Sequence, residues 1–182
     1  MVGVIRRATA DDLDALHELA AETFPLATTP GTDPADIAAF IRAHLTVEAF
    51  AGYLADPDRI VLVDDDAGGL VGYTMSVVAP PYDDDVRTAV DERFGEVTTA
   101  ELSKCYLRAS AHGTGLAQRL VAASLAAVAE RGVDVLWLGV NQHNPRAVAF
   151  YGKCGFERIG MKAFRVGERH ELDFVLAQSV AG

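Results

Sequence analysis

A glycine-containing segment at residues 111–117, in the order Ala-His-Gly-Thr-Gly-Leu-Ala, separates an apolar stretch from an alanine-rich one. If these stretches are a strand and a helix, the segment lies at the helix N-terminus, where unpaired N–H groups and the helix dipole favour a bound anion. It is not a P-loop, because no Gly-Lys-Ser/Thr follows. It is not the dinucleotide fingerprint, because Gln118 stands where the third glycine belongs. The alternatives are a phosphate-binding turn of another kind and a simple tight turn.

A second group of polar and aromatic residues follows the next apolar stretch. Asn144 and Pro145 are typical of a helix start, because Asn caps helices and Pro fits the first turn. Tyr151 lies about two turns into that helix, at the usual 3.6 residues per turn. A phenol can donate a proton to a developing anion. The other interpretation of Tyr151 is a core aromatic residue whose hydroxyl reaches a nearby partner.

These two segments resemble the two signatures of the GNAT acetyltransferase superfamily. The acetyl-CoA signature is Gln or Arg, two residues, Gly, one residue, then Gly or Ala, and His112, Gly115 and Ala117 occupy those positions. Residues 137–156, with an Asn-rich turn and a Phe-Tyr helix, resemble the second signature. The resemblance covers residues 101–156 and looks nearest to bacterial small-amine or polyamine-type members. His112 departs from the pattern, which leaves its contact with phosphate open.

The resemblance implies a binding site for acetyl-CoA as cosubstrate. Amides of the glycine segment would hold the pyrophosphate. Main-chain atoms at the end of the preceding strand would hold the pantetheine arm and the thioester, and the helix-capping Asn would reach the CoA arm. The residues implied to bind the cofactor are Tyr106, Leu107, His112, Gly113, Thr114, Gly115, Leu116, Ala117, Asn144 and Tyr151.

The resemblance also implies a catalytic pair. The family tyrosine that matches Tyr151 points at the CoA sulfur, so Tyr151 would be the general acid for the thiolate leaving group. A primary amine with a pKa of about 10.4 must lose a proton before it attacks. Glu101 resembles the base of many family members, although an exposed strand-end charge is the alternative. Other candidate bases are Asp83, Asp84, Asp85, Glu96, His17 and His112.

The two cysteines, Cys105 and Cys154, are too few for a zinc site or a disulfide framework, and no metal is expected. A covalent acyl-enzyme on Cys105 is an alternative mechanism. A strand cysteine without a His/Asp relay is usually a small buried hydrophobe, however. We therefore predict direct transfer within a ternary complex.

Composition limits the class of protein and of partner. The 182 residues carry a formal charge of −10 and 50% hydrophobic residues, which is typical of one folded domain spanning residues 1–182. The negative charge argues against a nucleic-acid partner. No stretch approaches a membrane span and no signal peptide is recognised, so a cytoplasmic location is expected. The expected partner is a small-molecule amine, with a peptide as the alternative, and the resemblance allows a homodimer because dimers are common in the family.

Hydrophobic periodicity and turn residues predict the elements that position these groups. Pro25 is expected to end the first helix, residues 64–69 to form a hairpin turn, and residues 80–99 to form a long connection that is a candidate lid. Strands are predicted at 2–9, 59–63, 70–79, 102–107, 133–140, 158–165 and 170–177. Helices are predicted at 11–24, at 34–56 as one helix or as two, and at 86–94, 115–130 and 144–154.

The predicted fold class is α/β, with a mixed, mostly antiparallel sheet of about six to seven strands flanked by helices. Its acetyl-CoA-binding core is a β-α-β unit over residues 101–156, and the resemblance implies that the two parallel central strands splay apart. The implied function is acetyl transfer to a primary amine of a small, polyamine-like or other molecule. The alternatives are a protein or peptide N-acetyltransferase, a non-catalytic acetyl-CoA-binding regulatory module, and an interaction module with accidental signatures. Aromatic residues that are candidates to shape the acceptor site are Phe24, Tyr53, Tyr73 and Tyr82.

Overall fold

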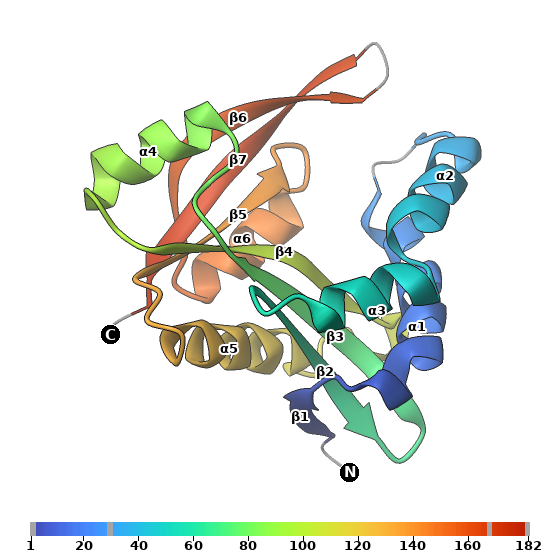
Figure 1. Cartoon of the computed structure of the whole chain (residues 1–182). Helices are drawn as coiled ribbons and strands as arrows, with labels where there is room; N and C mark the ends of the chain where they lie inside the picture. The colour runs from blue at the N-terminus through green and yellow to red at the C-terminus, as the bar shows by residue number, and fades with distance from the viewer. Residues whose placement is uncertain (1–2, 29–30, 167–168, 181–182) are drawn as a thin grey trace. The chain divides into compact units, whose positions relative to one another are not determined.

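The computed structural model describes residues 3–28, 31–166 and 169–180 (Figure 1). The described strands are β1 Val4–Arg7, β2 Arg59–Asp66, β3 Gly69–Val78, β4 Thr99–Leu107, β5 Val135–Asn141, β6 Glu157–Val166 and β7 Arg169–Ser179. The described helices are α1 Leu13–Ala27, α2 Pro34–His44, α3 Val47–Ala55, α4 Asp84–Phe94, α5 Leu116–Ala129 and α6 Pro145–Lys153, with short 3-10 turns η1 Ala10–Asp12 and η2 Ala109–Ala111.

The described strands form one mixed sheet in the order β1-β2-β3-β4-β5-β7-β6. Strands β4 and β5 are parallel, and their register runs from Thr99 opposite Val135 to Glu101 opposite Trp137. The pairs β1–β2, β5–β7 and β6–β7 are antiparallel. Because α5 connects β4 to β5, the β-α-β unit is present, and the predicted α/β class is confirmed. The predicted splay of β4 and β5 stays a prediction.

The chain divides into two compact units, each of which is described by itself. The first unit contains Met1–Met75 and Lys104–Ser124, and the second contains Ser76–Ser103 and Leu125–Gly182. The boundaries fall inside β3, β4 and α5, so each unit holds part of these elements. The single domain expected over residues 1–182 stays a prediction.

Helix α1 of the first unit is longer than its sequence predicts. It runs through Pro25 to Ala27, so the expectation that Pro25 ends the helix is wrong. A proline in the last turn removes only one helical hydrogen bond. Thr28 then closes the helix, because its amide and its hydroxyl donate to the Pro25 carbonyl oxygen at 3.4 and 2.8 Å.

The next helical stretch is split, as the sequence suggested. Helix α2 is capped by Asp33, whose side chain accepts a hydrogen bond from the amide of Ala35, and α3 is capped by Thr46. Phe50 of α3 is fully buried, whereas α2 has no buried residue. Among the described helices no single one is long and apolar enough to cross a membrane, although the bent pair α2 and α3 meets those limits by length and composition.

The hairpin between β2 and β3 has a shorter turn than predicted. Asp64 to Asp66 belong to β2 rather than to the turn. The Asp64 side chain is only 2% exposed, and its carboxylate lies 3.3 Å from the guanidinium of Arg119. Burial raises the pKa of Asp64. The expectation that the turn begins at residue 64 is wrong because Asp64 and Asp65 are paired with Arg119 and Arg6, which come from distant parts of the chain.

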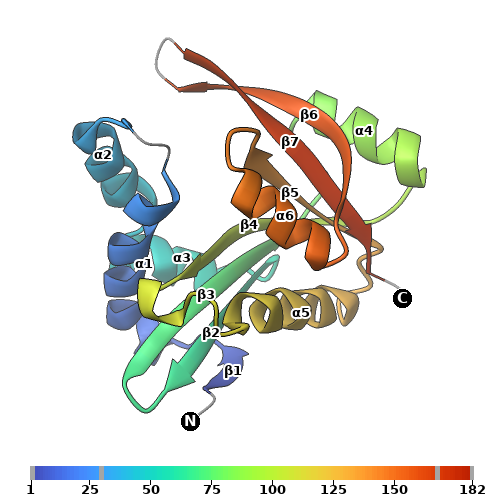
Figure 2. The ribbon, with the colours of Figure 1, turned by 180° about the vertical axis from the view of Figure 1, so that it is seen from behind.

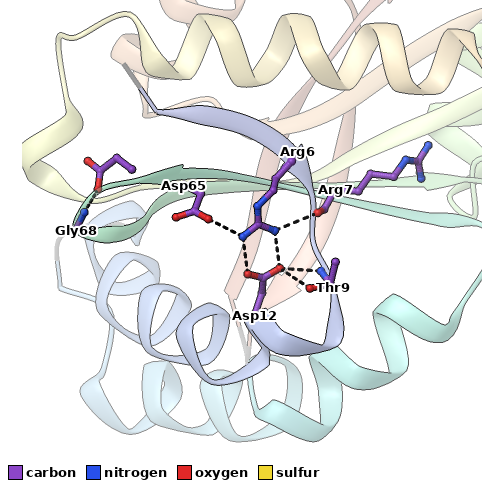
Figure 3. A network of polar contacts seen from close by, with 7 residues as sticks. Arg6, Arg7, Thr9, Asp12, Asp65 and Gly68 are labelled. Atoms are coloured by element: carbon purple, nitrogen blue, oxygen red, sulfur yellow. Dashed lines mark hydrogen bonds and ion pairs between the residues drawn. The ribbon is translucent and has the colours of Figure 1, made fainter. Parts of the chain in front are cut away.

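Strand β1 is held by an ion-pair network around Arg6 (Figure 3). Both guanidinium Nη atoms of Arg6 donate to the Asp12 carboxylate at 2.8 Å, and one also donates to Asp65 at 2.7 Å. Asp12 additionally accepts the amide of Thr9 at 2.7 Å and so completes the capping box that stabilises this helix start. These bonds lower the pKa of Asp12 to about 2.

This network predicts a pH-dependent contribution to stability. The pKa of Asp12 is depressed from its usual 3.8 in the folded state, so its stabilisation is complete above that value and is lost as the pH falls towards about 2. At pH 6 we expect Asp12→Asn to lower the free energy of unfolding by about 1–2 kcal/mol, since the partner guanidinium is partly exposed. Urea unfolding at pH 6 to 2 measures the difference, which should shrink as the pH falls.

The matched control is Asp11→Asn, a change at the exposed neighbouring carboxylate. It is expected to leave the free energy of unfolding within about 0.5 kcal/mol of the wild type. Equal losses in the two variants, or an Asp12→Asn loss that does not vary with pH, would contradict the assigned role of Asp12.

The core of the second unit includes α4, which lies within the connection of residues 80–99 predicted to be a candidate lid. Val86 and Val90 of α4 are buried against Val135 and Trp137 of β5 and against residues of β7. Gly160 of β6 permits close approach, because a Cβ placed there would lie 2.8 Å from the Cβ of Ala89 in α4. The helix predicted near 86–94 is therefore confirmed, and it is part of a packed core.

Candidate functional site

The turn between β4 and α5, yellow in Figure 2, has the backbone conformation that its glycines predict. Gly113 and Gly115 have φ angles of 79° and 82°, which lie in the left-handed region that favours glycine. No described heavy atom lies within 4 Å of a Cβ built at either position. Residues 112–115 are exposed, while Leu116 packs into the core with Leu120 and Ala111. The turn therefore presents its backbone outward from an anchored helix start.

The amides of this turn are available to an anion. The amides of Gly113, Gly115 and Ala117 have no acceptor among the described residues. Thr114 and Leu116 make only long contacts, from the Thr114 amide to the Ala111 carbonyl oxygen and from the Leu116 amide to the Thr114 hydroxyl, both at 3.4 Å. Unpaired amides at the positive end of a helix dipole suit a phosphate or pyrophosphate. The amide of His112 instead donates to the Ala109 carbonyl oxygen, so only its exposed imidazole is left for a ligand.

The strand that precedes the turn places Tyr106 and Leu107 in the same unit. Leu107 packs against the cluster that anchors α5. Gly72 of β3 lets the strands approach closely, because a Cβ there would lie 3.1 Å from Leu107 Cγ and 3.3 Å from the Tyr106 carbonyl oxygen. Burial raises the pKa of the Tyr106 phenol to about 12. The main chain of Tyr106 and Leu107 thus leads directly from the sheet into the turn.

The second unit carries the remaining predicted site residues, and each lies on the element expected for it. Glu101 is partly exposed in β4 opposite Trp137. Asn144 caps α6, because its side chain accepts the Ala147 amide at 3.0 Å, with Pro145 in the first helical position. Tyr151 is partly exposed in α6. Its ring makes edge contacts with Phe150 and Phe156, at centroid distances of 5.0 and 5.7 Å.

Three of the six alternative base residues make other contacts in the structure. Asp83 caps α4 by accepting the amides of Asp85 and Val86, at 2.9 and 3.2 Å. Asp84 is paired with Arg87 at 2.6 Å. The Nδ1 atom of His17 lies 2.7 Å from the Leu45 carbonyl oxygen. Asp85, Glu96 and His112 are exposed.

The described ranges hold no group of three His, Cys, Asp or Glu side chains arranged to bind a metal ion. Cys105 and Cys154 are both partly buried and form no disulfide. Burial raises the pKa of the Cys154 thiol.

Sequence reasoning missed a buried cation in the second unit. Lys162 of β6 is 9% exposed, and its Nζ atom donates to the Tyr82 hydroxyl at 3.2 Å. The same ammonium lies 5.5 Å from the Tyr82 ring centre and 5.6 Å from that of Trp137. Gly139 makes room for it, because a Cβ there would lie 2.8 Å from Lys162 Cε. These residues are separated by long stretches of sequence, so no local signal predicts the cluster.

Comparison with known proteins identifies the family. Residues 13–156 match the model of the acetyltransferase (GNAT) family. The chain belongs to the GNAT family. An uncharacterized N-acetyltransferase of Mycobacterium tuberculosis is 41% identical over 169 residues, which cover 93% of this chain and 98% of that protein. Because the chain belongs to this family, it is an acetyl-CoA-dependent N-acetyltransferase.

Solved GNAT structures resemble this chain over nearly its whole length. The PaiA N-acetyltransferase of Thermoplasma acidophilum, solved in complex with coenzyme A, has a TM-score of 0.75 at 20% identity, with 98% of this chain and 99% of that chain covered. A chimera of the Vibrio cholerae spermidine N-acetyltransferase has a TM-score of 0.68 at 19% identity, covering 100% and 97%. At these identities the likeness shows the GNAT fold and not the acceptor, so the expected polyamine-type subgroup is not established.

Proposed function

We propose that this GNAT enzyme transfers the acetyl group of acetyl-CoA to a primary amine of a small molecule, by direct attack within a ternary complex. The observation that carries the proposal is the set of amides at Gly113, Gly115 and Ala117, which have no acceptor among the described residues. They lie at the start of a helix anchored in the core. This arrangement suits the pyrophosphate of CoA.

Acetyl-CoA supplies a thioester carbonyl that is open to attack and a thiolate leaving group. In the proposed site the amides of residues 113–117 bind the pyrophosphate, and main-chain atoms of Tyr106 and Leu107 bind the pantetheine arm and orient the thioester. Asn144 reaches the CoA arm while it also caps α6, since one side chain can serve both roles. The imidazole of His112 is exposed and can add a contact to phosphate.

Two side chains are proposed to move protons. Glu101 takes a proton from the acceptor ammonium, directly or through water, because a protonated amine has no lone pair for attack. Tyr151 donates a proton to the departing sulfur. Among the other base candidates, Asp83, Asp84 and His17 are engaged in caps, ion pairs or backbone contacts.

The acceptor class separates this proposal from its alternatives. A protein or peptide N-acetyltransferase would use the same cofactor residues with a peptide N-terminus as acceptor. A regulatory module would bind acetyl-CoA without releasing CoA to any amine. A homodimer is compatible with each of these functions.

The first experiment is calorimetric titration of the purified chain with acetyl-CoA and with CoA, followed by assay of CoA release with a panel of amines. Binding at micromolar concentration together with amine-dependent CoA release supports the proposal. Tight binding without release with any amine or N-terminal peptide favours the regulatory module. If acetyl-CoA does not bind, the proposed function is wrong.

A further inference from the structure

Arg108 is the first residue after β4, and it lies between that strand and the turn proposed to bind the pyrophosphate. Its main chain is hydrogen-bonded on both sides. Its amide donates to the Val71 carbonyl oxygen of β3 at 2.9 Å, and its carbonyl oxygen accepts the Ala111 amide at 3.0 Å. The backbone of Arg108 therefore joins β3 to the 3-10 turn η2.

The side chain of Arg108 bridges two elements of the first unit. Its Nε atom donates to the Leu70 carbonyl oxygen of β3 at 3.1 Å, and one Nη atom lies 3.2 Å from a carboxylate oxygen of Glu22 in α1. A guanidinium presents its donors in a planar fork, so it can hold two acceptors in fixed positions. Arg108 thus ties the end of β4 to both β3 and α1.

Hydrogen bonds continue from Arg108 into the turn between β4 and α5. Ala111, whose amide donates to Arg108, accepts with its own carbonyl oxygen the Thr114 hydroxyl at 2.7 Å and the Thr114 amide at 3.4 Å. The same hydroxyl accepts the Leu116 amide at 3.4 Å. A continuous series of hydrogen bonds therefore runs from Arg108 to the turn that is proposed to bind the pyrophosphate.

Arg108 also follows directly the two residues whose main chain is proposed to bind the pantetheine arm and the thioester. Strands β3 and β4 approach closely there, because a Cβ at Gly72 would lie 3.3 Å from the Tyr106 carbonyl oxygen. The acceptors that Arg108 uses in β3, Leu70 and Val71, come just before Gly72. These contacts therefore fix the end of β4 at the point proposed to orient the thioester.

The guanidinium of Arg108 is paired within the protein. It already contacts a carboxylate and a carbonyl oxygen, so a cofactor phosphate would have to compete with both. The side chains of Arg108 and Glu22 are 36% and 48% exposed. Ion pairs this exposed contribute little to global stability. Their effect is therefore expected in the local backbone rather than in the overall fold.

From these observations we infer that Arg108 is a positioning residue of the acetyl-CoA site. It holds the main chain that precedes it and the turn that follows it in the arrangement that binds the cofactor, and Glu22 fixes its guanidinium. The inference rests on the proposed function and adds to it a residue that contacts neither the acceptor nor the cofactor.

The first test is Arg108→Gln, which removes the fork. We expect kcat to fall about tenfold and the Kd for acetyl-CoA to rise about fivefold, because small misplacements of reacting groups lower rates steeply. The melting temperature should fall by no more than about 4 °C. The matched control is Arg59→Gln, since Arg59 is 29% exposed and pairs with Asp56 at 3.0 Å in the same unit. It should leave kcat and Kd within about twofold.

Arg108→Lys separates the fork from the charge. Lysine keeps the positive charge and can bind a phosphate, but its single ammonium group does not reproduce the planar fork. We therefore expect Arg108→Lys to show the same losses in kcat and Kd as Arg108→Gln. Wild-type constants in Arg108→Lys would show that the charge alone matters, and would overturn the positioning role.

A double-mutant cycle tests whether Glu22 acts through Arg108. Glu22→Gln removes the charge that fixes the guanidinium, so in that background Arg108→Gln should lower kcat only about threefold instead of about tenfold. The cycle cancels any general effect of one fewer negative charge on CoA binding. An equal fall in kcat in both backgrounds would contradict the role of Glu22.

Amide hydrogen exchange keeps the inference separate from the proposed function, because it needs neither cofactor nor turnover. In Arg108→Gln the amides of Ala111 and His112 should exchange at least about tenfold faster, whereas Arg59→Gln should leave them unchanged. Faster exchange supports the positioning role even in a protein that acetylates no amine. Unchanged exchange, or wild-type kcat and Kd in Arg108→Gln, would overturn the inference and leave acetyl transfer intact.

Discussion

Gly115→Glu is expected to weaken acetyl-CoA binding at least about 100-fold, which is about 2.7 kcal/mol. Gly115 has a φ of 82°, a conformation that costs a residue with a side chain about 1–2 kcal/mol. A Cβ there meets no described atom within 4 Å, so the new side chain would extend into the space in front of the turn. Its carboxylate would then repel the pyrophosphate from the amides of Gly113 and Ala117. Calorimetric titration with acetyl-CoA measures the effect.

Gly132→Glu is the matched control for this change. Gly132 follows the opposite end of α5 and has a φ of 72°. As at Gly115, a Cβ built there has no described atom within 4 Å. The two variants therefore carry similar backbone strain and the same added charge, but only one alters the proposed anion-binding turn. Gly132→Glu should bind acetyl-CoA within about threefold of the wild type, a difference of about 0.7 kcal/mol. Equal binding by Gly115→Glu and Gly132→Glu would contradict the assignment of the turn.

The features that the sequence predicted well are local in origin. The left-handed φ angles at Gly113 and Gly115 follow from the residue type, and the α6 cap at Asn144 follows from Asn followed by Pro. The parallel β4-α5-β5 unit was predictable because two apolar stretches flank one amphipathic helix between turn residues. For the φ angles and the cap the information lies within about six residues, the range over which caps and turns act. For the β4-α5-β5 unit it lies in the order of three consecutive elements along the chain.

The features that the sequence did not reveal depend on partners far apart in the chain. Asp64 looks like a turn residue until Arg119 is placed beside it, and Lys162 looks like a surface charge until Tyr82 and Trp137 enclose it. The unpaired hydroxyl of Tyr73 is likewise a property of its neighbours. Tertiary contacts can bury a charge or a polar group when they supply compensating interactions. The sequence pattern around one residue does not reveal which distant residues make those contacts.

Tyr151→Phe is expected to lower kcat about 100-fold, within the range that a single general acid contributes. Phenylalanine keeps the edge contacts with Phe150 and Phe156, at 5.0 and 5.7 Å, so α6 should retain its packing. Only the hydroxyl is lost, and with it the proton proposed to reach the departing sulfur. Steady-state rates of CoA release with saturating amine and acetyl-CoA measure the change.

The comparison of kcat with binding decides whether Tyr151 acts in the chemical step. An acid that works only as the carbon–sulfur bond breaks contributes little to ground-state binding, so the Kd of acetyl-CoA should stay within about threefold in Tyr151→Phe. A structural role would instead lower the melting temperature and weaken acetyl-CoA binding together with kcat. A variant that keeps the wild-type kcat would show that solvent or another group protonates the sulfur, and Tyr151 would then be a packing residue of α6.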